Sequence, residues 1–78
     1  MKQLETTYIG RADVTVDTIQ LENGNICYLY NKDGDTSLLP HLDALLKFLD
    51  GDTSVRMGCF PTAEADEIIE GFEKLFND

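Results

Sequence analysis

The dipeptide Asn23-Gly24 lies between residues 14–21, in which apolar and polar residues largely alternate, and residues 26–30, which form a short apolar run. Alternation with a period of two indicates β-strands. Asn-Gly between two apolar segments favours a tight hairpin, because a type I′ turn needs positive φ at both of its central residues. We therefore expect an antiparallel hairpin with Asn23 and Gly24 as its two-residue loop.

A two-residue loop at this position would set the register of the hairpin. It would place Leu21 opposite Ile26 and Ile19 opposite Tyr28. Residues that are directly opposite each other in an antiparallel pair share a face of the sheet. These four apolar side chains are therefore expected to line the buried face.

The first strand changes the phase of its alternation in the middle. Val14 and Val16 are the apolar positions before Asp17, whereas Ile19 and Leu21 are the apolar positions after it. A β-bulge near Asp17 would restore a single apolar face, because a bulge inserts one extra residue into a strand. The sequence thus predicts a bulged strand that is buried on one side.

The second half of the chain is expected to form a helix, a strand and another helix. Leucines recur at helical spacing over residues 38–49, with Thr36 or Ser37 as the N-cap. Alternation returns over residues 53–60 and predicts a third strand. A second amphipathic helix is expected to start at Thr62, which would cap it.

These elements predict an α+β fold in ββαβα order, with a short additional strand near residues 4–9 as an option. A right-handed crossover would make the third strand parallel to the second. Both helices would then cover one face of the sheet, giving a two-layer sandwich with an open second face. A chain of 78 residues is expected to form a single domain, residues 1–78.

The excess of acidic residues restricts the kinds of molecule that the protein is expected to bind. Fifteen acidic residues face six basic ones, for a net charge of −9. Direct binding to nucleic acid requires Lys and Arg on phosphates, and anionic lipid likewise attracts basic segments, so we expect neither. The first residues lack the apolar core of a signal peptide. We therefore expect a cytoplasmic protein with reduced thiols, in the host cytoplasm if the chain is phage-encoded.

No sequence pattern indicates catalysis, a metal or a cofactor, and we expect none of the three. His41 is the sole histidine, and pairing it with Cys27 or Cys59 as a nucleophile is the less favoured reading. The pentapeptide Asp-Gly-Asp-Thr-Ser occurs at residues 33–37 and again at 50–54, but neither copy fits a calcium-binding loop. Both copies are interpreted as turns.

Arg56 stands out as a basic residue in an acidic chain. In the predicted third strand it alternates outward from Val55 and Met57. There it would anchor a carboxylate or a partner, or else pair with a nearby Asp.

The last helix provides the leading candidate for a functional surface. From residue 61 onward there are six acids and one base, Lys74. The acids are expected to form a stripe opposite the apolar side, and the proposed partner-binding residues are Glu64, Asp66, Glu67, Glu70 and Glu73. This pattern predicts a protein-binding module, an inhibitor or adaptor for a basic, nucleic-acid-binding surface. Phage anti-defence and DNA-mimic proteins share this size and charge, and the similarity extends no further. The alternative is that these acids form a solvent-exposed helix face without a binding function.

The competing hypothesis is a homodimer or a regulatory subunit of a larger assembly. Its contacts would be the open sheet face, represented by Tyr8, Cys27 and Leu29, together with an edge strand.

Overall fold

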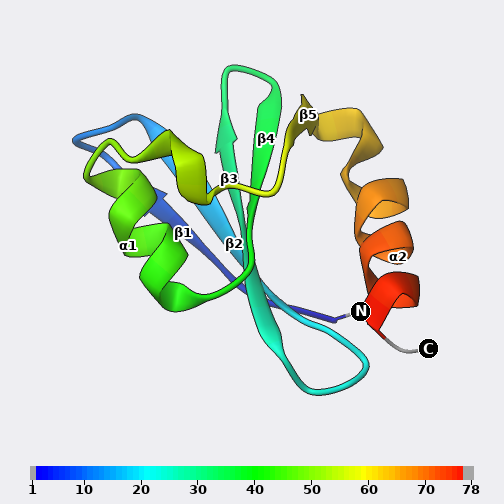
Figure 1. Cartoon of the computed structure of the whole chain (residues 1–78). Helices are drawn as coiled ribbons and strands as arrows, with labels where there is room; N and C mark the ends of the chain where they lie inside the picture. Colours follow the sequence, from blue (N-terminus) through cyan, green and yellow to red (C-terminus); the bar gives the residue numbers. More distant parts are fainter. Residues whose placement is uncertain (1, 77–78) are drawn as a thin grey trace.

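The computed structural model describes residues 2–76, with side chains as far as Lys74, and it confirms the α+β class (Figure 1). Two α-helices accompany the strands: α1 (Leu42–Leu49) and α2 (Ala65–Phe76). Each is preceded or followed by a short 3-10 turn, η1 (Thr53–Val55) after α1 and η2 (Thr62–Glu64) before α2. The strands are β1 (Lys2–Ile9), β2 (Val14–Gln20), β3 (Ile26–Lys32), β4 (Asp35–Leu39) and β5 (Cys59–Pro61).

Within the described residues, the five strands form one open sheet in the order β1-β2-β3-β4-β5, and each neighbouring pair is antiparallel. The optional N-terminal strand is present as β1. The predicted ββαβα order is wrong, because residues 35–39 form β4 instead of starting a helix. The predicted parallel strand over residues 53–60 is also wrong: η1 occupies its start, and only its end joins the sheet, antiparallel to β4.

The hairpin between β2 and β3 has a three-residue loop, one residue longer than predicted. The Leu21 N–H donates to the Asn25 carbonyl at 2.8 Å, and the Gly24 N–H donates to the Leu21 carbonyl at 3.0 Å. Gly24 has a φ of 89°, as three-residue hairpin loops with a left-handed last residue require. Ile19 consequently pairs with Cys27 instead of Tyr28. A slip of one residue moves every side chain of a strand to the other face, so the predicted set of inward-facing residues is wrong for β3.

The tight two-residue turn occurs in the next hairpin. Asp33 and Gly34 have φ values of 53° and 85°, and the flanking residues Lys32 and Asp35 are paired across β3 and β4. Positive φ at both central positions is the type I′ requirement. Asp-Gly at this position thus explains why the chain turns back as β4 instead of entering a helix.

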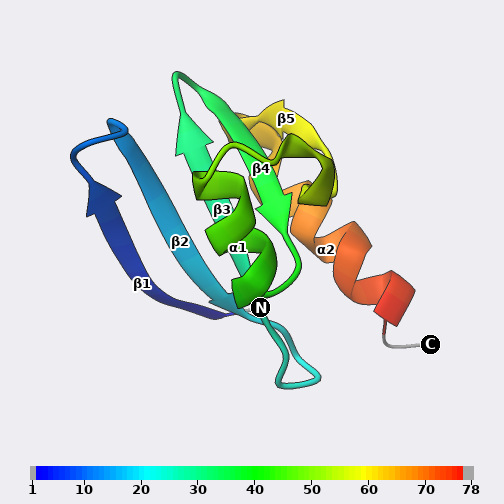
Figure 2. The ribbon, with the colours of Figure 1, turned by 60° about the vertical axis from the view of Figure 1, so that its left-hand side comes forward.

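The helices lie on opposite sides of the sheet, as the view of Figure 2 shows together with Figure 1. On one side, Cys27 and Leu29 of β3 pack against Ile69 and Phe72 of α2. The Cys27 side chain is only 1% exposed. The prediction that one face of the sheet is open is therefore wrong. That face is covered by α2 and forms a second core.

The other side of β3 packs against α1. Tyr28 and Tyr30 contact the cluster formed by Leu39, Ala44 and Leu45. Successive side chains of a strand point to opposite faces, so β3 contributes alternately to the two cores. Its apolar residues are therefore consecutive instead of strictly alternating.

The same arrangement accounts for the change of phase in β2. Val16 belongs to the α1 core and Ile19 belongs to the α2 core. The pairing of β2 with β3 is regular, and the irregularity lies in β1, between Gln3 and Glu5. The predicted bulge near Asp17 is wrong, because the strand changes the helix that it packs against and not its register.

A ladder of polar side chains crosses the α2 side of the sheet beyond the apolar core. The Asp17 carboxylate accepts hydrogen bonds from Thr6 Oγ1 at 2.6 Å and from Asn31 Nδ2 at 2.9 Å. Thr36 Oγ1 donates to Asn31 Oδ1 at 2.5 Å and is 2.8 Å from Thr62 Oγ1. These bonds connect β1, β2, β3, β4 and η2, so the polar middle of β2 is satisfied within the sheet.

Two glycines provide a matched test of the turn that sets the register. A Cβ added at Gly24 or at Gly71 would meet no atom within 4 Å, but only Gly24 has positive φ. Gly24→Ala should lower the free energy of unfolding by about 1–2 kcal/mol. Gly71→Ala, inside α2, should raise it by about 0.5–1 kcal/mol. Urea denaturation of both variants measures the difference, and equal effects would contradict the three-residue turn.

Candidate functional site

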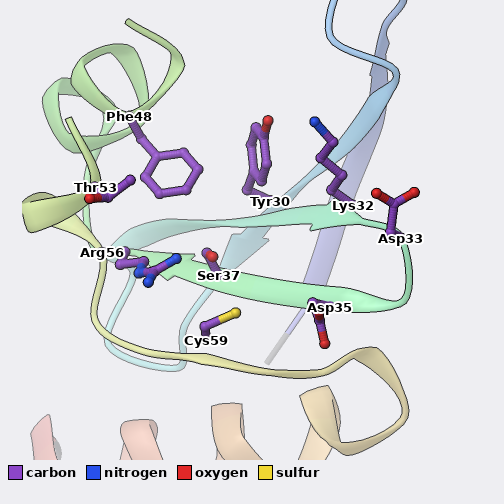
Figure 3. Close-up of a pocket in the computed structure, with 9 residues that line it drawn as sticks. All are labelled: Tyr30, Lys32, Asp33, Asp35, Ser37, Phe48, Thr53, Arg56 and Cys59. Carbon is purple, nitrogen blue, oxygen red and sulfur yellow. The ribbon is translucent and has the colours of Figure 1, made fainter. Parts of the chain in front are cut away.

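A groove of about 410 Å³ lies on the α1 side of the sheet, next to the segment that joins α1 to β5 (Figure 3). Its floor is built from β3, β4 and β5, which contribute Tyr30, Ser37 and Cys59. Its wall comes from α1 and the segment after it, through Phe48 and Arg56. Ligand sites in proteins commonly have about 300–1,000 Å³, so this groove is large enough for a small organic molecule.

Local capping holds the segment that carries Arg56. The Asp52 carboxylate accepts hydrogen bonds from the Ser54 N–H at 3.0 Å and from Ser54 Oγ at 2.5 Å. The hydrogen bonds from Ser54 hold the pKa of Asp52 below its ordinary value. The Met57 N–H donates to the Leu38 carbonyl at 2.7 Å. Arg56 is therefore fixed between a capped turn and the edge of β4.

The charges of the groove are separated along its length. Arg56 lies at the end next to α1, whereas Asp33 and Asp35 lie at the β3–β4 turn, with Lys32 next to them (Figure 3). Within residues 2–74, Arg56 makes no ion pair and no side-chain hydrogen bond. The predicted alternative, in which Arg56 pairs with a nearby Asp, is not found there. A free guanidinium near an aromatic wall is suited to binding an anionic group.

The groove is also lined by two aromatic rings, Tyr30 and Phe48, and by the hydroxyl of Ser37. The Tyr30 and Phe48 rings meet edge to face, with centroids 4.7 Å apart and planes at 69°. Ser37 is 5% exposed, and its hydroxyl has no hydrogen-bond partner in the described part of the chain. Buried hydroxyls usually have a hydrogen-bond partner. Because the Ser37 hydroxyl has none among the described residues, it is available to a molecule in the groove.

A second hollow, of about 290 Å³, lies on the other side of α1, against β1 and β2. Ile9, Tyr28 and Leu42 contribute to its largely apolar lining, and Glu5 is the charged residue that lines it. It offers no cationic group for an anion. The groove with Arg56 is the better-equipped site.

Four of the five acidic residues predicted to bind a partner are exposed, and the fifth is buried. Glu64, Asp66, Glu67 and Glu70 are exposed at the start and along the outer side of α2. Glu73 is 8% exposed and lies on the buried side of the helix. It is four residues after Ile69, and this spacing places two side chains on the same face of a helix. Glu73 is therefore not part of an exposed acidic stripe.

The three residues predicted for a dimer face share one side of the sheet, but they do not form an open surface. Cys27 and Leu29 are buried beneath α2. Tyr8 of β1 is 63% exposed, and its hydroxyl donates to an Asp13 carboxylate oxygen at 3.0 Å, which raises the pKa of Tyr8. Of these three side chains, only Tyr8 is accessible for contact with another molecule.

The two cysteines have different environments. Burial, with a smaller contribution from the negative charge of Glu73, raises the pKa of the Cys27 thiol from 9.0 to about 11. Nucleophilic cysteines work as thiolates and have lowered pKa values, so the environment of Cys27 opposes that role. Cys59 is exposed and lines the groove.

His41 and the repeated pentapeptide have local structural roles. His41 is the N-cap of α1, and its Nδ1 accepts a hydrogen bond from the Ala44 N–H at 3.1 Å. The helix therefore starts later than the predicted caps, Thr36 and Ser37. One pentapeptide begins in the β3–β4 turn and the other follows α1, where Gly51 has a φ of 106°.

The described side chains contain no group of three or more His, Cys, Asp or Glu residues placed to hold a metal ion. Among the helices of residues 2–76, none has the length and apolar character needed to cross a membrane. Comparison of the chain with protein-family models, with curated proteins and with solved structures finds no match.

Sequence reasoning singled out Arg56 but missed the groove around it. Tyr30, Ser37 and Phe48 come from β3, β4 and α1 and meet only in the folded chain. The sequence feature that indicates this groove is Asp33-Gly34. A two-residue hairpin turn at these residues places Ser37 on a strand opposite Tyr30.

Alkylation of the thiols should distinguish the two cysteines. In the native protein at neutral pH, iodoacetamide should modify Cys59, and Cys27 should react only after unfolding, because it is buried and its pKa is raised. Mass spectrometry would count the labels. Cys59→Ser should abolish native labelling, and equal modification rates for both thiols would contradict the buried position of Cys27.

Stability should fall at alkaline pH because of Cys27. The thiol keeps its proton in the folded chain up to about pH 11, whereas the unfolded chain loses it from about pH 9. The unfolded state is then favoured progressively between these values. Urea denaturation at several pH values should show a steeper loss of stability for the natural chain than for Cys27→Ala. Parallel curves would mean that the Cys27 pKa is not raised.

Proposed function

We propose that this protein is an acidic protein-binding module, an inhibitor or adaptor that docks the outer side of α2 on a basic surface of a partner protein. A nucleic-acid-binding surface is the partner type that the charge fits best, since such surfaces are basic in order to contact phosphates. In this proposal the protein is not an enzyme and competes by charge for the partner's surface, in the cytoplasm.

The observation that carries the proposal is the exposed group of four carboxylates, Glu64, Asp66, Glu67 and Glu70. Within residues 2–74 none of the four forms an ion pair. Complementary charge raises the rate of encounter between proteins and selects among partners. The net charge of −9 adds to this effect over the whole molecule.

A second candidate function is self-association along β1. This strand is an edge of the sheet, it is eight residues long, and its side chains other than Ile9 are exposed. An uncovered edge strand presents unpaired backbone groups that a second chain could bond. Leu4 and Tyr8 would supply apolar contacts at that edge. The chain would then act as a homodimer or a subunit of a larger assembly.

Capture of partners from native lysate tests the acidic module. A tagged chain should retain a basic protein in washes at about 0.01 M salt and lose most of it at about 0.15 M, because the screening length falls from about 30 Å to about 8 Å. The triple variant Glu64→Gln, Glu67→Gln and Glu70→Gln should lose that partner even at low salt. Bound proteins are identified by mass spectrometry.

A control variant separates a specific surface from general acidity. Glu5→Gln, Glu22→Gln and Asp43→Asn remove the same number of charges at exposed positions outside α2, and this variant should keep the partner. Equal loss in both variants would mean that net charge alone attracts the partner. Retention of the partner by the α2 variant would exclude the α2 surface, and recovery of only the chain itself would favour the dimer.

A further inference from the structure

The groove next to Arg56 differs from the rest of the molecule in its charge. The chain has six basic residues against fifteen acidic ones, and two of the six, Lys32 and Arg56, line this groove. Arg56 has no ion-pair partner in residues 2–74, and the acidic residues that line the groove, Asp33 and Asp35, lie at its other end. A guanidinium that remains unpaired in an acidic protein is open to an anion from outside the chain.

The Ser37 hydroxyl is a second, independent feature of the site. Ser37 is 5% exposed, and it lies on the groove floor, where Figure 3 shows it beside the Arg56 side chain. Its register position opposite Tyr30 turns it toward α1 and away from the core under α2. A hydroxyl and a guanidinium facing the same space form a pair of donors for a carboxylate, and Arg binds a carboxylate with two parallel hydrogen bonds.

The shape and the outer charges narrow the class of ligand. The Tyr30 and Phe48 rings form an apolar wall against which a flat group can pack. Asp33 and Asp35 at the opposite end would repel a second negative charge. The net charge of −9 also disfavours polyanions such as nucleic acid.

We infer that the groove is a binding site for a small organic monocarboxylate with a flat apolar body. The carboxylate binds Arg56 and the Ser37 hydroxyl, and the apolar body packs against Phe48 and Tyr30. This site faces the α1 side of the sheet, opposite to the side covered by α2, so it is separate from the acidic surface proposed for a protein partner.

An NMR titration of the full chain tests the inference, with 3-phenylpropionate as the probe and 3-phenylpropanol as its neutral analogue. The carboxylate should cause saturable amide shifts that centre on Ser37, Arg56 and Cys59. The alcohol should bind at least about tenfold more weakly, because it lacks the charge-assisted bonds. Absence of saturation, shifts centred elsewhere, or equal binding of the alcohol would overturn the proposal.

Matched arginine variants separate the site from general charge effects. Arg56→Gln should weaken binding by about tenfold or more, whereas Arg11→Gln, which removes an exposed arginine at the β1–β2 turn, should leave it unchanged. Ser37→Ala should weaken binding to a smaller extent. Binding by Arg56→Gln equal to that of the natural chain would exclude Arg56 as the anchor.

Cys59 provides a readout that needs no variant. It lines the groove and is exposed, so a bound carboxylate should slow its alkylation by iodoacetamide several-fold at saturation. The alcohol at the same concentration should not. Alkylation at an unchanged rate in the presence of saturating carboxylate would place the ligand outside the groove and overturn the inference.

Discussion

Burial of β3 on both faces is the constraint on which the rest of the structure depends. Cys27 and Leu29 pack under α2, while Tyr28 and Tyr30 pack under α1. A strand with two buried faces has to lie inside a sheet and requires a covering element on each side. The chain supplies these elements after β4, with a helix on each side of the sheet. The small protein consequently has two thin cores instead of one deep core.

The two hairpin turns decide which side chains enter which core. Gly24 ends a three-residue loop and Gly34 ends a two-residue loop, so the registers on the two sides of β3 are set by local backbone conformation. Because side chains alternate along a strand, a change of one residue in either loop would exchange the two cores. The polar ladder around Asp17 and Asn31 adds a second constraint on the same register, since its hydrogen bonds form only when these residues share a face.

The two candidate surfaces of the protein follow from the same layout. On one side, α2 has a buried face that includes Glu73, and its exposed acids lie on the outside. On the other side, α1 is only eight residues long and does not cover the whole sheet. The segment after α1 returns along the edge of β4 and brings Arg56 over the uncovered part. A groove therefore forms around Arg56, which has no ion-pair partner within residues 2–74, in a protein with a net charge of −9.

Local features of the sequence predicted much of the secondary structure. The alternation in residues 14–21 and the Asn23-Gly24 turn correctly indicated an antiparallel strand pair, and the amphipathic pattern after Thr62 correctly indicated the last helix. The acidic composition bounds the possible partners, and Arg56 was recognisable as an exception. The turn predicted at residues 33–37 is a hairpin turn at Asp33-Gly34, and it leads into β4 instead of a helix.

The amino-acid sequence by itself determined which segments are apolar, where the chain turns and how strongly it is charged, because these are properties of neighbouring residues. Only the tertiary structure decided that Val16 and Ile19 serve different cores, that Glu73 turns inward and that Tyr30, Ser37, Phe48 and Arg56 share a groove. Alternation along a strand shows that a face is buried but not which helix buries it. That choice is made by contacts between residues far apart in the chain.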